Sequence, residues 1–154
     1  MPIEVKPDFV KMEQDILALW DERDCFNKLR EKSKDNKRFR FLDGPITANN
    51  PMGIHHAWGR SIKDIVLRYK AMNGHSCHYR NGFDTQGLWV EVEVEKELGF
   101  EDKKDIIAYG MGNFTRKCVE RIKKYSGVIT GQSKRLGQWM DWGNSYFTHT
   151  DENI

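Results

Sequence analysis

The sequence has no apolar run close to the roughly 20 residues that cross a bilayer, so we expect no transmembrane helix. Its start, MPIEVKPDFVKMEQD, is too acidic and too interrupted for a signal peptide. The three cysteines, Cys25, Cys77 and Cys118, lie far apart without a CxxC pair, which predicts reduced thiols and excludes a disulfide framework. These absences predict a cytoplasmic protein that contacts no membrane.

Neither sign of charge is in excess, because 25 Lys and Arg face 23 Asp and Glu. This balance neither demands nor excludes nucleic acid as a partner. The segment KLREKSKDNKRFR, residues 28–40, is locally basic and is typical of a solvated helix end and linker, with phosphate contact as the alternative. A length of 154 residues with 38% hydrophobic residues predicts one globular domain with a real core.

The periodicity of apolar residues alternates between helix and strand along the chain. Asp8 is the expected N-cap of the first helix, and Asn73-Gly74 and Gly99 are expected helix stops. In the central helix, Ile62, Ile65, Val66, Tyr69 and Met72 form the expected buried stripe. We expect, in order, a helix at 8–31, a strand at 38–43, a loop at 44–53, a helix to residue 72, a strand at 75–80, a loop at 81–87, and helices at 88–98 and 103–125. This order predicts an α/β fold with parallel strands and crossover helices.

The stretch PMGIHHAWGR, residues 51–60, carries two adjacent histidines where the central helix begins. A helix N-terminus presents free amides and a partial positive charge to a phosphate, and imidazoles can donate to its oxygens. Gly53 and Gly59 would let a nucleotide approach the backbone. The pattern therefore predicts nucleotide binding by Gly53, His55, His56 and Gly59, and the alternative is that the histidines only cap and pack the helix.

The loop NGFDTQG, residues 81–87, places Asp84 between two glycines at the expected end of a strand. A carboxylate there could hold an ammonium group, and an Asx-turn is the alternative interpretation. A metal site is not expected, because the five His and Cys residues at positions 55–78 match no common zinc spacing.

Several blocks together resemble class I aminoacyl-tRNA synthetases, most closely the isoleucyl, valyl and leucyl branch. The blocks are FLDGPITANN at 41–50, GIHHAWG at 53–59, IKDIVLRYKAMNGH at 62–75, NGFDTQGLWVEVEVEKELG at 81–99 and RLGQWMDWGNSYFT at 135–148. The DTQG turn, the IKDIV helix and the RLG block are most similar to the isoleucyl enzymes. The resemblance covers nearly the whole chain.

The signature departs from the HxGH pattern of that family. Aligned on the residues that follow it, Gly53 stands where the first histidine belongs and His55 where the glycine belongs, which gives GxHH and resembles a variant among bacterial isoleucyl enzymes. The second histidine corresponds to His56, and we hypothesise that His55 takes the phosphate role of the first. Gln86 and Trp89 stand where the family often has His and Pro.

The resemblance implies ATP-dependent attachment of isoleucine to tRNA(Ile) through an aminoacyl-adenylate, by a monomer that uses ATP with Mg²⁺ as substrate and holds no tight cofactor. His55 and His56 would be catalytic and, with Gly53 and Gly59, bind ATP. The implied amino-acid pocket consists of Gly44, Pro45, Ile46, Thr47, Asp84 and Gln86.

The resemblance also implies a division of the chain. Residues 1–38 would form an N-terminal helical extension, and residues 39–154 the N-terminal half of the Rossmann-like aminoacylation domain. The family's editing insertion, KMSKS half and anticodon-binding domain have no counterpart here, so we expect a truncated product or a fragment that is inactive alone. The alternatives are a leucyl or valyl enzyme, a small HxGH-type nucleotidyltransferase, and a non-catalytic remnant that binds nucleotide or protein.

Overall fold

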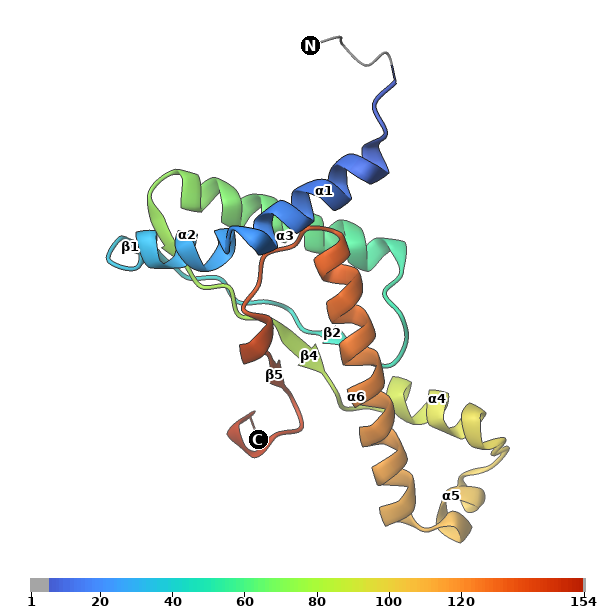
Figure 1. The fold of residues 1–154 in the computed structure, drawn as a ribbon. Helices are drawn as coiled ribbons and strands as arrows, with labels where there is room; N and C mark the ends of the chain where they lie inside the picture. Colours follow the sequence, from blue (N-terminus) through green and yellow to red (C-terminus); the bar gives the residue numbers. More distant parts are fainter. Residues whose placement is uncertain (1–5, 154) are drawn as a thin grey trace. The chain divides into compact units, whose positions relative to one another are not determined.

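A computed structural model describes residues 6–153 (Figure 1). The helices are α1 (Phe9–Glu22), α2 (Cys25–Ser33), α3 (Ile54–Met72), α4 (Leu88–Leu98), α5 (Lys103–Tyr109) and α6 (Met111–Arg135), with 3-10 turns η1 (Trp142–Asn144) and η2 (Asp151–Asn153). The strands are β1 (Lys37–Phe39), β2 (Ile46–Thr47), β3 (His75–Cys77), β4 (Gly82–Asp84) and β5 (Tyr146–Phe147). The chain divides into two compact units, the first made of residues up to 40 and 66–78, the second of 41–65 and 79–154.

The first unit contains two short helices and a parallel strand pair. The expected single helix at 8–31 is wrong, because Asp24 has a left-handed backbone with φ of 48° and separates α1 from α2. Asp8 is the N-cap of α1, as predicted, and its carboxylate accepts from the Lys11 N–H at 3.0 Å. β1 pairs in parallel with β3, with Phe39 opposite Cys77.

Helix α3 ends where predicted, since Met72 is its last residue and Gly74 has a positive φ of 75°. The stripe predicted to be buried is exposed instead, from 41% at Val66 to 86% at Met72. The buried face carries Leu67, Arg60 and Asp64. The sequence interpretation failed here because Arg60 and Asp64, whose side chains form hydrogen bonds within the protein, lie on the inner face of the helix.

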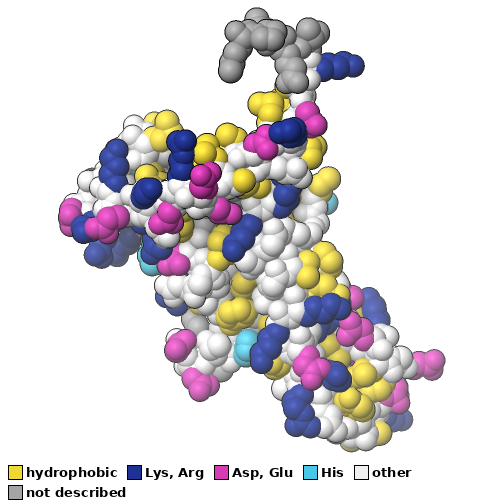
Figure 2. All heavy atoms as spheres, in the orientation of Figure 1, with side chains coloured by type: hydrophobic (Ala, Val, Ile, Leu, Met, Phe, Trp, Pro, Cys, Tyr) yellow, Lys and Arg dark blue, Asp and Glu magenta, His cyan; other side chains and the backbone are white. Residues whose placement is uncertain are grey.

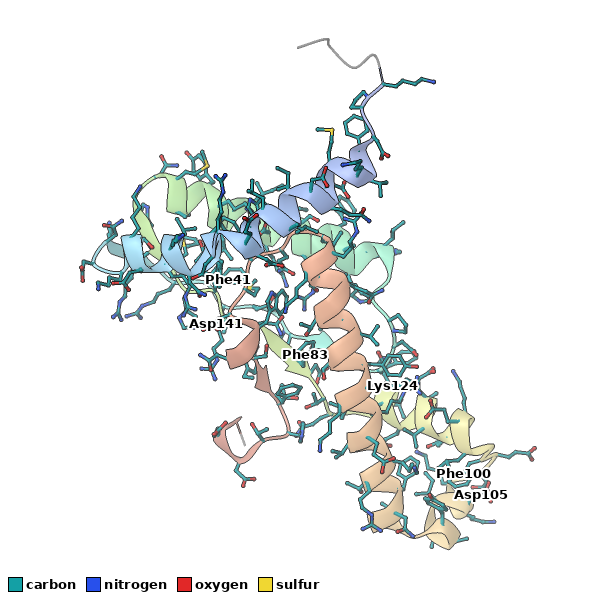
Figure 3. All side chains as sticks on the ribbon, viewed as in Figure 1. Phe41, Phe83, Phe100, Asp105, Lys124 and Asp141 are labelled. Carbon is teal, nitrogen blue, oxygen red and sulfur yellow. The ribbon has the colours of Figure 1, made fainter. Side chains whose placement is uncertain are left out.

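The second unit is built on a three-stranded parallel sheet in the order β2-β4-β5. Ile46 lies opposite Phe83, and Gly82 lies opposite Tyr146. Phe83, labelled in Figure 3, is buried against α6. Its ring stacks on that of Phe147, with the ring centroids 5.2 Å apart. The buried core around it consists of Ala48, Phe83, Val90, Ile122 and Ile129.

The predicted helix at 103–125 is also two helices. Gly110, with φ of 94°, separates α5 from α6, and α6 continues to Arg135, ten residues beyond the predicted end. A capping box begins α5, in which Asp102 accepts from Lys104 N–H and Asp105 accepts from the Asp102 N–H at 3.0 Å. The backbone N–H groups of Asp102 and Glu101, which both donate to the Asp105 carboxylate, lower the pKa of Asp105. Figure 3 shows Asp105 near Phe100, close to α4 and α5.

Parallel strands connected through helices confirm the predicted α/β architecture. None of the described helices is long and apolar enough to cross a membrane. Lys and Arg side chains are mixed with Asp and Glu on the visible face (Figure 2).

Candidate active site

The GxHH turn forms the entry to α3. The Gly53 carbonyl accepts from the Ala57 N–H at 3.1 Å, which begins the helical ladder. The Gly53 N–H donates to Nδ1 of His56 at 3.2 Å. Because Nδ1 accepts, the neutral imidazole carries its proton on Nε2 and can donate from that nitrogen. The His56 side chain is exposed, so this donor faces solvent beside the helix N-terminus.

His55 is likewise exposed in the first turn of α3. A methyl group added at Gly59 would meet no atom within 4 Å, and one at Gly53 would lie 3.6 Å from His56 Nδ1, an ordinary contact. Neither glycine has a positive φ. The protein itself therefore does not require glycine at these positions, and the space they leave suits a ligand that approaches the backbone.

The predicted amino-acid residues gather at the carboxyl ends of two neighbouring strands. Thr47 ends β2 and lies opposite Asp84, which ends β4. The Thr47 hydroxyl donates to one Asp84 carboxylate oxygen at 3.2 Å, and the Gln86 N–H lies 3.4 Å from the other. The Gln86 contact has the form of the Asx-turn that the sequence left as an alternative. The half-buried carboxylate keeps capacity for a further donor.

Three residues that the sequence interpretation missed surround Asp84. The Thr148 hydroxyl lies 3.5 Å from the Asp84 carboxylate and accepts from the Thr85 N–H at 3.0 Å. The Thr85 hydroxyl accepts from the His149 N–H at 3.1 Å and lies 2.7 Å from His149 Nδ1. This network connects the loop after β4 to the segment after β5. The only sequence signal was the concentration of hydroxyls in FTHT, close to the RLG block.

Gly44 and Pro45 lie just before β2, in a segment attached to α3 by one lysine. Lys63 Nζ contacts the buried Asp43 carboxylate at 2.5 Å and the Gly44 carbonyl at 3.3 Å. The Tyr146 hydroxyl donates to the Asp43 carbonyl at 3.0 Å. Burial, with Asp43 as the second cause, raises the pKa of Tyr146, so the phenol stays protonated. The backbone of residues 43 and 44 is thus fixed beside the predicted pocket.

Deeper in the same unit, a polar cluster occupies the inner face of α3. The Arg60 guanidinium donates to the side-chain oxygens of Asn81 and Gln138, both at 3.1 Å. The Asp64 carboxylate accepts from the Trp139 N–H at 3.0 Å. These bonds connect α3 to the segment after α6, and they account for the polar inner face of the helix.

The structure therefore brings the predicted residues together in two groups. Gly53, His55, His56 and Gly59 lie on the first turns of α3, while Thr47, Asp84 and Gln86 meet at the strand ends. Within residues 6–152, no group of three or more His, Cys, Asp or Glu side chains is arranged to hold a metal ion. The chemistry available at the site is hydrogen-bond donation to an anion and carboxylate recognition of a cation.

Comparison with known proteins shows the family of the chain. The family described as tRNA synthetases class I (I, L, M and V) matches residues 15–153. The chain belongs to this family, which confirms the resemblance stated from the sequence blocks.

Individual relatives are more specific. The isoleucine–tRNA ligase of Dehalococcoides mccartyi (strain ATCC BAA-2266 / KCTC 15142 / 195) is 42% identical over 149 residues, which are 97% of this chain and 15% of the ligase. The isoleucine–tRNA ligases of Methanosarcina mazei and Sulfolobus acidocaldarius are each 40% identical over 152 residues, 14% of their lengths. The chain thus spans about 15% of the length of the curated relatives it matches.

One solved structure has the same fold. It is the LeuRS of Agrobacterium radiobacter K84 agnB2, in a ternary complex with tRNA and LeuAMS. The TM-score is 0.70 at 17% sequence identity, over 96% of this chain and 16% of that one. The likeness confirms the predicted α/β fold, which matches that of a class I synthetase catalytic domain.

Proposed function

We propose that this chain is part of an enzyme that activates isoleucine with ATP and transfers it to tRNA(Ile). The observation that carries the proposal is the hydrogen bond from the Gly53 N–H to His56 Nδ1, which makes Nε2 a donor at the N-terminus of α3. The names of the relatives that match nearly the whole chain support isoleucine as the amino acid.

In the first step, an isoleucine carboxylate oxygen attacks the α-phosphorus of ATP. The bond from that phosphorus to the bridging oxygen breaks, and pyrophosphate leaves with its Mg²⁺. His56, through Nε2, and His55 donate to phosphate oxygens. The backbone amides at the start of α3 add a partial positive charge that stabilises the same oxygens. The step requires no covalent enzyme intermediate, so the contribution of these residues is positioning and stabilisation of charge.

Asp84 pairs with the substrate ammonium. Its carboxylate accepts from the Thr47 hydroxyl at 3.2 Å and lies 3.5 Å from the Thr148 hydroxyl, and it has acceptor capacity for the ammonium as well. The backbone of Gly44, Pro45, Ile46 and Thr47 would line the amino-acid pocket, and Gln86 would lie at its rim. In the second step the activated aminoacyl group passes to the 3′ end of tRNA.

An apolar pocket separates isoleucine from valine by one methylene, which is worth about 1–3 kcal/mol. We therefore expect the activation step to prefer isoleucine by roughly 10- to 200-fold over valine. A pocket specific for valine would reverse this order, and one specific for leucine would prefer leucine to both.

The test is amino-acid-dependent ATP–pyrophosphate exchange by the product of the whole reading frame that encodes this chain. We expect exchange with isoleucine, weaker exchange with valine, and a rise in the KM for isoleucine on Asp84→Asn. Exchange that is absent with all three branched-chain amino acids, or that is best with leucine, would contradict the proposal.

A further inference from the structure

Helix α6 holds the segment that joins β2 to the GxHH turn. This segment, residues 48–52 and here called the approach loop, has little regular structure and contains two asparagines and a proline. It is held at two points by side chains of α6, one from Arg121 and one from Gln132. Both positions lie in the same compact unit as the turn.

The first point is the Arg121 guanidinium, whose side chain is only 4% exposed. Its Nε donates to the Asn49 carbonyl at 2.8 Å, and its Nη2 donates to the Asn50 side-chain oxygen at 2.7 Å. Two carboxylates of α4, those of Glu97 and Glu93, complete its surroundings. Arg121 thus attaches the middle of the approach loop to α4 and α6 together.

The charges around Arg121 are balanced within the unit. A hydrogen bond from Lys96 is the main cause that lowers the pKa of Glu93, with Asn50 and Arg121 as further causes. The Arg121 guanidinium also lies over the Tyr125 ring, 4.6 Å from its centroid. A planar fork with several donors is required to reach a carbonyl, an amide and a carboxylate at once, and lysine has no such fork.

The second point is Gln132, whose side-chain oxygen accepts from the Met52 N–H at 2.7 Å. Met52 is adjacent to Gly53, the residue that donates to His56. Arg121 and Gln132 are eleven residues apart on α6, which is about three turns, so they leave the helix on nearly the same face, roughly 16 Å apart along its axis. Two side chains on one face of α6 therefore hold the approach loop, one at Asn49 and one at Met52.

Fold stability alone gives a poor explanation of this arrangement. A buried, paired arginine is often no better for stability than an apolar residue of similar volume. Two of the hydrogen bonds of Arg121 end on the approach loop, and the second attachment point, Met52, lies one residue before the turn that carries the histidines. Precise placement of a catalytic turn requires such support, since a displacement of about 1 Å can cost about 100-fold in rate.

We propose that Arg121 and Gln132 are positioning residues that set the location of the GxHH turn for ATP. The inference rests on the proposed function, because it assigns these residues to the same nucleotide site. Their role is exerted through the backbone that they hold. They fix the backbone of Asn49 and Met52, and through Met52 the direction of the Gly53 N–H and of His56.

The experiment compares Gln132→Met with Lys134→Met in the product of the whole reading frame. Gln132→Met keeps the length of the side chain and removes the acceptor for Met52. Lys134 is exposed on the same turn of α6 and serves as the matched control. The measured quantities are kcat, the KM for ATP and the KM for isoleucine in pyrophosphate exchange, together with the melting temperature.

For Gln132→Met we expect kcat/KM for ATP to fall about tenfold, the usual worth of one such hydrogen bond, with the KM for isoleucine unchanged. Lys134→Met should match the wild type. Arg121→Lys should change the ATP parameters in the same direction, and if that variant does not fold, the Gln132 result decides alone.

Unchanged ATP parameters in Gln132→Met would overturn the inference. So would equal losses toward ATP and isoleucine that follow a fall in melting temperature, because those indicate a general loss of structure. A wild-type protein without isoleucine-dependent exchange would instead contradict the proposed function, so the two failures are distinguishable.

Discussion

Gly82 shows how one residue fixes the sheet beside the site. It lies directly opposite Tyr146 in the pairing of β4 with β5, and a methyl group at its Cα would overlap the Tyr146 ring. The ring is in turn held by its hydroxyl on the Asp43 carbonyl. The absence of a side chain at residue 82 is therefore a packing requirement, in contrast to Gly53 and Gly59, where the protein leaves open space.

We predict that Gly82→Ala destabilises the protein by about 1–3 kcal/mol, because the ring must move out of a bonded position. Urea unfolding measures the change. In a Tyr146→Ala background the same substitution should cost much less, since the overlapping ring is gone. Equal costs in both backgrounds would refute the packing argument.

Part of the site was predictable residue by residue, and part was not. His56 and Asp84 carry chemistry in short local patterns, so the sequence alone pointed to them. Thr85, Thr148 and His149 were missed because their contacts join positions more than sixty residues apart, such as Thr85 and Thr148. Arg121 and Gln132 were missed for the same reason, since a helical pattern does not reveal which loop a polar side chain reaches.

At the scale of elements, the sequence predicted the ends of α3 and α4 well, but it merged the other helices in pairs and predicted the strands poorly. α3 and α4 end where the glycine stops indicated, at Met72 and Leu98. β2 and β4 lie inside segments that the turn residues marked as loops, because strands of two or three residues leave no alternation to detect. They exist through pairing between distant residues, such as Thr47 with Asp84.

The breaks in the helices have backbone causes. Asp24 and Gly110 both have positive φ, and neither interrupts the apolar periodicity by which the helices were predicted. A single glycine within an apolar helical pattern does not exclude a continuous helix. An aspartate at such a position excludes it even less. The sequence therefore merged α1 with α2, and α5 with α6.

The inner face of α3 gives a direct test of the corrected burial pattern. Leu67 is fully buried, while Met72, five residues later, is 86% exposed. We predict that Leu67→Ala lowers the free energy of unfolding by about 2–5 kcal/mol, and that Met72→Ala changes it by no more than about 0.5 kcal/mol. Thermal and urea unfolding of the two variants measure these changes in the free energy of unfolding. A larger loss for Met72→Ala than for Leu67→Ala would restore the stripe that the periodicity predicted.

At the scale of the whole molecule, the chain corresponds to about 15% of its isoleucine–tRNA ligase relatives. Its second unit holds both groups of candidate residues, the histidines on α3 and Asp84 on β4. The division into residues 1–38 and 39–154 stays a prediction, and so does the monomeric state of the enzyme. The proposal for ATP and isoleucine depends on these two groups acting on one substrate pair.

The most direct test of the account is isoleucine-dependent ATP–pyrophosphate exchange with single histidine variants, in the product of the whole reading frame. His55→Ala and His56→Ala should each lower kcat by roughly 100- to 1,000-fold, because each removes a donor to developing phosphate charge. His78→Ala, which removes an exposed histidine outside the turn, should leave exchange unchanged. Full exchange activity in both His55→Ala and His56→Ala would contradict the claim that the GxHH turn is the phosphate site.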